Sequence, residues 1–151
     1  MATTYQSNAV KAGYGISPRM VEKGDFSVIA VFEAATQLIV NDVIQMLKVP
    51  AGATVVDLKL AVDDLDSGTA CVLAVGDGTV ADRFISGSTI GQGGGVVELG
   101  AGVTGAAAAD LAGYKYAAED TIDVKVTTAP AGGGVGTIKL IALLTMEPIQ
   151  G

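Results

Sequence analysis

A glycine pattern is the first feature of this sequence that could carry chemistry. Gly100, Gly102 and Gly105 match the G-x-G-x-x-G spacing, and a short apolar stretch precedes them. In dinucleotide-binding proteins such glycines let a pyrophosphate approach the N-terminus of the following helix. The chain holds 21 glycines in 151 residues, so a single match is weak evidence. The alanine run that follows stops at Gly113 and no second strand–helix–strand unit is visible, so we expect no cofactor.

Aspartates are concentrated in the middle of the chain. Asp63, Asp64 and Asp66 lie together, and Asp77 and Asp82 follow. Several carboxylates on a fixed loop could bind Ca²⁺. The spacing matches no loop of the EF-hand type, and aspartate is common in turns because its side chain bonds nearby backbone N–H groups. We predict the turn role and no metal site, with a cation at this cluster as the open alternative.

The residue types that usually perform catalysis are scarce. The chain has no histidine, which removes the commonest general base and the commonest metal ligand. Its single cysteine, Cys71, stands in an apolar run and is typical of a small buried side chain. Carboxylate pairs that cleave sugars usually work beside aromatic side chains, yet the chain has no Trp, 4 Tyr and 3 Phe. We predict that the protein is not an enzyme and has no catalytic residues.

Charge and composition restrict the partners of the chain. There are 16 Asp and Glu against 9 Lys and Arg, a net charge of −7. Nucleic-acid binding needs clustered basic residues, so we expect no nucleic acid. No apolar run reaches the roughly 18 residues of a membrane helix, and the N-terminus lacks a signal-peptide layout, so we expect no membrane and synthesis in the cytoplasm. Charged residues make up only 17%, which predicts a partly apolar surface that needs a partner.

The elements that must position these residues are β-strands. From Phe26 onward the period of the sequence is close to 2. The clearest alternation predicts a half-buried strand with an inward face of Val56, Leu58, Leu60 and Val62. An Asp-Gly pair at Asp77 predicts a hairpin whose return strand covers 80–86.

The last strand, predicted over 135–146, is apolar on both faces. Ile141 and Leu143 lie on the face opposite its main apolar row. Such a strand is usually central in a sandwich or buried at a subunit contact, so both residues are interface candidates. About eight strands at these spacings predict an all-β, antiparallel sandwich with at most one short helix, at 106–112.

The N-terminal stretch differs from the rest. Residues 1–25 show neither a period of 2 nor one of 3.6, and we predict an irregular arm here, followed by a β-sandwich domain over 26–151. Two interpretations stay open: a loose terminus, or an arm that becomes ordered on a partner. Tyr5, Tyr14 and Arg19 are the interface candidates of this arm, since tyrosine and arginine are favoured at interfaces.

Several segments carry a resemblance to a known family. They are the stretch 47–56, the Asp-rich turn 64–68, the Val-Gly-Asp-Gly-Thr segment 75–79, and 119–126 with the Ala-Pro-Ala-Gly turn after it. Through them the chain resembles, over about 26–147, the small proteins of tailed bacteriophages that decorate or cement capsids, many of them jelly rolls. The resemblance implies a homotrimer on the outside of the shell, bound to the major capsid protein, without an active site.

Three functions follow, in order of preference. The first is a virion structural protein that binds the capsid exterior as a homotrimer and stabilises it by burying apolar surface, a location that suits an acidic chain better than the DNA-filled interior. The alternative is a carbohydrate- or host-surface-binding module of a phage fibre or spike, with ligand loops at 76–82 and 87–105. The third, a virion-associated hydrolase, is disfavoured by the lack of histidine and of a nucleophile arrangement.

Overall fold

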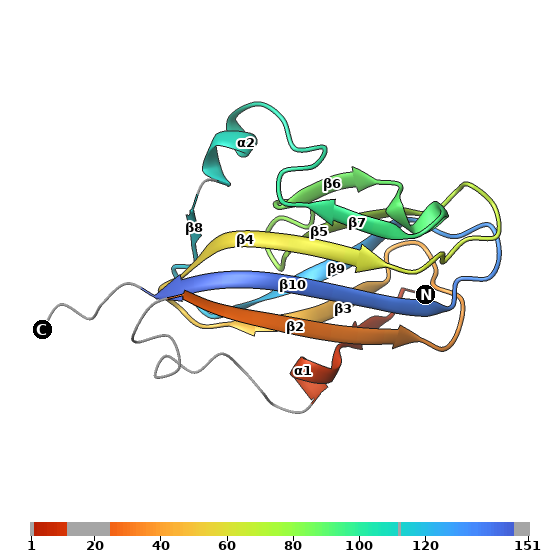
Figure 1. Ribbon diagram of the computed structural model, residues 1–151, viewed down its shortest axis with the longest axis horizontal. Coiled ribbons are helices and arrows are strands. Elements are labelled where there is room, and N and C mark those ends of the chain that lie inside the picture. The colour runs from red at the N-terminus through yellow and green to blue at the C-terminus, as the bar shows by residue number, and fades with distance from the viewer. Residues whose placement is uncertain (1, 12–24, 112, 147–151) are drawn as a thin grey trace, which may run out of the picture.

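The computed structural model describes residues 2–11, 25–111 and 113–146 (Figure 1). The strands in this part of the chain are β1 Thr4–Gln6, β2 Asp25–Ala34, β3 Val43–Val49, β4 Ala53–Val62, β5 Val72–Asp77, β6 Ile85–Ser88, β7 Gly95–Glu98, β8 Tyr114–Lys115, β9 Asp120–Thr128 and β10 Gly136–Met146. The helical segments are α1 Asn8–Lys11, the 3₁₀ turn η1 Ile90–Gln92 and α2 Ala106–Asp110. No helix among these is long and apolar enough to cross a membrane.

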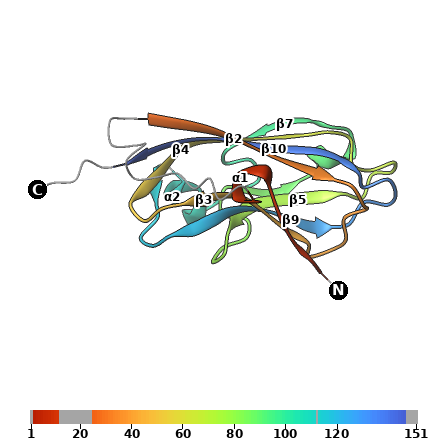
Figure 2. The ribbon, with the colours of Figure 1, turned by 90° about the horizontal axis from the view of Figure 1, so that it is seen from below.

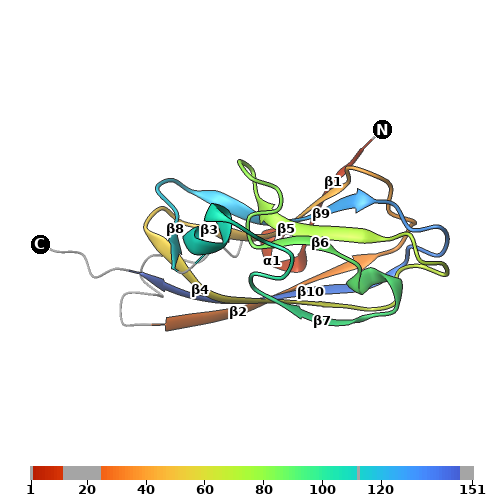
Figure 3. The same cartoon turned by 90° about the horizontal axis from the view of Figure 1, so that it is seen from above.

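The strands form two sheets that face each other as layers (Figures 2 and 3). One sheet has the order β1-β3-β9-β5-β6; the other has β2-β10-β4-β7, with β8 also paired to β4. The chain crosses between the sheets at each step from β2 to β10 except in the β5–β6 hairpin and at the short β8. Apart from β1 and β8, this gives two four-stranded sheets with the connectivity of a jelly roll. The predicted antiparallel, jelly-roll-like sandwich is confirmed.

The core lies between the sheets and is built from alternate residues of the strands. The inward row of β10 consists of Ile138, Leu140, Ala142 and Leu144, and each of these is at most 1% exposed. β10 itself lies between β2 and β4, which confirms the first of the two predicted positions, a central strand of the sandwich. Burial at a subunit contact stays a prediction. Its flanking strands pair its backbone on both sides, while its outward residues Ile141 and Leu143 stay half-buried.

One residue of the inward face predicted for β4 lies on the other side. Val56 is 45% exposed, while its neighbour Val55 is fully buried. On β10 the consecutive residues Leu143 and Leu144 pair with Asp57 and Val55, so Val56 is the extra residue of a β-bulge. A bulge reverses the inward–outward alternation, and the period of the sequence alone does not reveal it.

The first described residues pack along an edge of the sandwich. β1 pairs in parallel with β3. The Ser7 hydroxyl donates to the carbonyl oxygen of Met46, and the side-chain oxygen of Asn8 accepts from the Val31 N–H of β2 at 2.7 Å. Residues 4–11 therefore link the two sheets at this edge. The division of the chain at residue 25 stays a prediction.

Candidate interaction surface

The strand register brings apolar side chains onto the outer face of the β2-β10-β4-β7 sheet. Ile141 of β10 lies opposite Ile29 of β2 on one side and Lys59 of β4 on the other. The neighbouring row across the four strands begins at Val31 of β2 and ends at Val96 of β7. We call the outward apolar side chains of this sheet the apolar face; its members are Ile29, Val31, Val56, Val96, Ile141 and Leu143.

Much of the apolar face is open to solvent. Ile29 is 61% exposed and Val96 is 59% exposed, which is unusual for such large apolar side chains. Charged side chains lie among its members: Lys139 of β10 stands in the row of Val31 and Val96. Lys59 of β4 stands beside Ile141 and forms an ion pair with Glu98 at 3.5 Å. That ion pair is solvent-exposed and contributes little to stability. An exposed sheet face on which apolar side chains gather beside charged ones is a candidate contact surface.

The structure separates the five predicted interface residues into three groups. Ile141 and Leu143 are half-buried and lie together on the apolar face. Tyr5 packs against Phe32 at the edge of the sandwich, with ring centroids 5.4 Å apart, and its interface role stays a prediction. Tyr14 and Arg19 lie outside the described residues.

Sequence reasoning missed four members of the apolar face, which are Ile29, Val31, Val56 and Val96. Ile29 carried a signal, because a large apolar residue at an outward position of an alternating strand is out of place on a wetted face. Val56 carried none, since its exposure depends on the bulge. Val96 belongs to β7, a four-residue strand in a glycine-rich stretch that gives too short a pattern to predict.

The G-x-G-x-x-G pattern is used for turns and for close backbone contact. All three of its glycines have positive φ, between 70° and 92°. A Cβ at Gly102 would stand only 1.9 Å from the carbonyl oxygen of Ser86. The segment lies between antiparallel strands, and α2, which follows it, has only five residues. The strand–helix–strand context of a dinucleotide site is therefore absent from this segment.

The predicted turn role of the aspartate cluster is clearest at Asp66. Its carboxylate accepts hydrogen bonds at 2.7–2.9 Å from the backbone N–H groups of Gly68, Ala70, Cys71 and Ala131. Burial alone would raise the pKa of Asp66, but the four N–H groups outweigh it and hold the pKa at about 2.

The neighbouring aspartates are also bound to backbone. Asp64 accepts from the Asp66 N–H at 3.1 Å, and Asp63 accepts from the Thr137 N–H at 3.0 Å. Over the described ranges, no three His, Cys, Asp or Glu side chains gather as metal ligands would. These carboxylates hold the 63–68 loop in shape.

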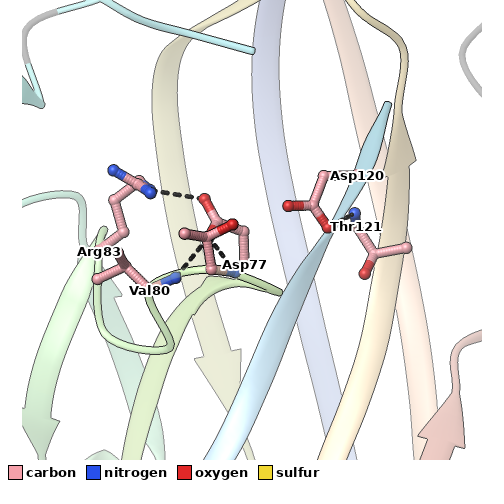
Figure 4. Close-up of polar contacts among 6 residues, drawn as sticks. Asp77, Val80, Arg83, Asp120 and Thr121 are labelled. Atoms are coloured by element: carbon pink, nitrogen blue, oxygen red, sulfur yellow. Dashed lines mark hydrogen bonds and ion pairs between the residues drawn. The ribbon is translucent and has the colours of Figure 1, made fainter. Parts of the chain in front are cut away.

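A further ion pair organises the β5–β6 hairpin (Figure 4). The hairpin at the Asp-Gly turn is confirmed, but its return strand is β6 Ile85–Ser88 and not the predicted 80–86. Asp77 accepts from the N–H groups of Thr79 and Val80, and its other oxygen accepts from the Arg83 Nε at 2.6 Å. Burial raises the pKa of Asp77, but these bonds outweigh it and leave the pKa below its usual value. The Arg83 guanidinium lies 4.1 Å above the Tyr114 ring, so the pair is also packed from above.

The single thiol has no feature of a nucleophile. Cys71 is fully buried, and burial together with the nearby Asp66 charge raises its pKa to about 11. It is therefore protonated at neutral pH and packs as the small apolar side chain that was predicted.

Comparisons with known proteins identify similar folds. No model of a protein family matches the chain, and no curated protein matches it. A chain in the capsid of Ralstonia phage GP4 is 27% identical with a TM-score of 0.71, covering 95% of this chain and 98% of that one. A chain in the capsid asymmetric unit of cyanophage Pam1 is 19% identical with a TM-score of 0.66, covering 82% and 85%. A chain in the acidic stable capsid of Helicobacter pylori bacteriophage KHP30 is 16% identical with a TM-score of 0.56, covering 85% and 91%. The chain is thus similar over most of its length to chains of bacteriophage capsid structures.

Proposed function

We propose that this chain is a structural protein of a bacteriophage virion, a decoration or cement protein that binds the outer surface of the capsid and stabilises it. The observation that carries the proposal is the likeness to the chain of the Ralstonia phage GP4 capsid. It spans 95% of one chain and 98% of the other, so the two have nearly the same size and the same sandwich.

The chemistry of the described side chains supports a structural role. Asp66 and Asp77 are committed to backbone and Arg83, and the Cys71 thiol is protonated. What the molecule offers a partner is its shape, its apolar face and its net charge of −7. A negative chain is repelled by packaged DNA and is better placed outside the shell than inside it.

We assign the contact with the major capsid protein to the apolar face. Its exposed side chains would be removed from water there, at about 25 cal/mol for each Å² of apolar surface. Each contact can be modest, because a shell that carries many copies adds their effects. The contact opposes separation of neighbouring capsomers under the outward pressure of packaged DNA.

We further propose that the protein is a homotrimer, as the resemblance to cement proteins implies. Light scattering on the purified protein tests this directly, with a mass three times that of the chain as the expected result. A monomer at every concentration would contradict the trimer and leave capsid binding to be judged by its own experiment.

The decisive experiment mixes the purified protein with undecorated capsids of its phage. Co-sedimentation and a higher temperature of capsid disruption are expected, and absence of both would refute the proposal. Ile29→Lys places a charge on the apolar face and should weaken binding about tenfold or more. Val40→Lys is the matched control, because Val40 is also exposed, at 49%, but lies in the β2–β3 loop.

The fibre-module alternative finds less support. Sugar sites usually offer an exposed aromatic ring, but Tyr114 lies beneath Arg83 and Tyr116 is buried. In the 76–82 loop the Asp77 carboxylate accepts hydrogen bonds from the Thr79 and Val80 N–H groups, so these groups are not available to a ligand. Binding to a glycan array in the presence of Ca²⁺, without binding to capsids, would favour this alternative.

A further inference from the structure

A buried carboxylate lies on the outer side of the β1-β3-β9-β5-β6 sheet, away from the apolar face. Asp123 of β9 stands between Gln45 of β3 and Gly76 of β5, in a row of outward positions. It is nevertheless only 8% exposed. The hairpin loop after β5 covers it: a Cβ at Gly76 would stand 2.1 Å from the Val80 carbonyl oxygen, so the loop rests directly on the strand.

Asp123 lines a hollow of about 250 Å³ beside this loop. The other lining residues are Thr4, Val43, Gln45, Asp77, Gly78, Ala81 and Lys125. A water molecule takes up about 30 Å³, and sites for drug-sized ligands start near 300 Å³. The hollow therefore has room for one group about as large as an amino-acid side chain.

One oxygen of Asp123 is left without a partner. Its Oδ1 is buried and makes no hydrogen bond within the described part of the chain. Burial raises the pKa of Asp123 to about 6; a Thr121 hydrogen bond opposes the rise, and the charges of Asp120 and Asp77 add to it. At neutral pH the carboxylate is still mostly ionised, and a buried, unpaired charge is costly. A cationic hydrogen-bond donor would remove that cost.

The charged residues that line the hollow are Asp77, Asp123 and Lys125. Asp120 acts on Asp123, and Lys48 of β3 stands opposite Thr121 in the strand register. Asp77 has both oxygens engaged and is paired with Arg83. Lys125 stands two residues from Asp123 on the same strand face, and among the described residues no ion pair joins the two. Asp123 is therefore the carboxylate of the lining that has an oxygen available for a guest.

We propose that this hollow binds one alkylammonium or alkylguanidinium group, with the Asp123 Oδ1 as its acceptor. A carboxylate that is shielded from water binds such donors through short, charge-assisted hydrogen bonds. The group can come from a free organic amine or from a Lys or Arg side chain of a neighbouring protein. A divalent metal is disfavoured, because the described residues place no three metal-ligating side chains together. The proposal does not depend on capsid binding.

Carboxyl-detected NMR on the intact protein tests the site, with methylguanidinium and methylammonium as the added cations. A saturable shift of the Asp123 Cγ signal and a lower apparent pKa for Asp123 are expected. Asp66 is the internal control, since four N–H groups already fill its carboxylate. No saturable change, or the same change with NaCl at equal ionic strength, would overturn the proposal. A larger effect of Mg²⁺ than of either organic cation would also overturn it.

Two variants make the assignment specific. Asp123→Asn keeps the shape of the side chain and should abolish saturable binding, as monitored by the backbone signals of the 78–82 loop. Lys125→Met tests whether the chain's own lysine competes for the hollow. Binding that is retained or strengthened in this variant supports the proposal, and loss of binding contradicts it.

Capsid binding then distinguishes the two sources of the cation. If Asp123→Asn binds capsids several-fold more weakly than the parent, the guest is a side chain of the shell. If capsid binding is unchanged while methylguanidinium binding is lost, the guest is a free amine. Failure of the parent to bind capsids refutes the proposed function alone, because the NMR result does not involve capsids.

Discussion

At the scale of single residues, the Asp66 carboxylate connects two loops that are far apart in the sequence. Three of its N–H donors follow within five residues, and the fourth, Ala131, lies 65 positions later. One ionised side chain thus fixes the 63–68 loop to the turn before β10. The same aspartates that could have suggested a cation site stabilise backbone instead.

Removing the Asp66 carboxylate should lower the free energy of unfolding far more than removing the carboxylate of its neighbour Asp64. Asp66→Ala leaves four buried or half-buried N–H groups without an acceptor, so a large drop in the midpoint of urea unfolding is expected. Asp64→Ala removes a single bond from an exposed side chain and should change the midpoint little. Equal effects of the two substitutions would contradict the assigned role.

Asp123 predicts an unusual pH dependence. Its folded pKa of about 6 lies above the value of about 3.9 expected in the unfolded chain, so the native state binds more protons between these values. The contribution of Asp123 to the stability of the folded state is complete below pH 4 and is lost as the pH rises through 6. Stability measured by urea unfolding should therefore fall between pH 5 and pH 7.

The control for this prediction is Asp123→Asn, in which the fall between pH 5 and pH 7 should disappear. Asp66 works in the opposite direction, because its folded pKa is lowered to about 2. Its contribution is present above about pH 4 and is lost as the pH falls toward 2. The parent protein should then be most stable near pH 4 to 5. An optimum above pH 7 would contradict the Asp123 assignment, and a loss of stability between pH 4 and pH 2 no larger than that of Asp66→Ala would contradict the Asp66 assignment.

At the scale of elements, the β5–β6 loop depends on the missing side chain of Gly76. Gly76→Ala would drive a methyl group into the Val80 carbonyl, 2.1 Å away, and lift the loop off the sheet. A loss of at least about 2 kcal/mol in the free energy of unfolding is expected from such overpacking. Gly93→Ala is the control, because a Cβ there meets nothing within 4 Å; hydrogen exchange of the loop should change in the first variant only.

The long strands could be predicted because their side chains alternate over many residues. In β9 the row Ile122, Val124 and Val126 is buried as its pattern indicates. Short or irregular elements escaped prediction for a physical reason: β7 has four residues, and the exposure of Val56 depends on its partner strand. Asp123 stands on the outward side of its strand, and only the folding-over of a distant loop buries it.

At the scale of the whole molecule, the two outer sheet faces differ in chemistry. One sheet presents the apolar face, and the other presents the hollow at Asp123 beside Lys125. A protein with two such faces can rest on one neighbour through the first and contact another group through the second. The net charge of −7 affects the binding of partners to either face. Added salt weakens contacts between charged groups by screening, but it does not screen apolar contacts.

Salt therefore separates the forces that hold the protein on a capsid. Raising NaCl from 0.05 M to 1 M shortens the Debye length from above 10 Å to about 3 Å. If the apolar face supplies the binding energy, this change should alter the capsid affinity less than about threefold. Ammonium sulfate should strengthen binding, because sulfate favours burial of apolar surface. Ile29→Lys should lose this strengthening, while Val40→Lys should keep it. An affinity that falls steeply with salt in the parent would instead place the main contact on charged groups and remove the apolar face from that role.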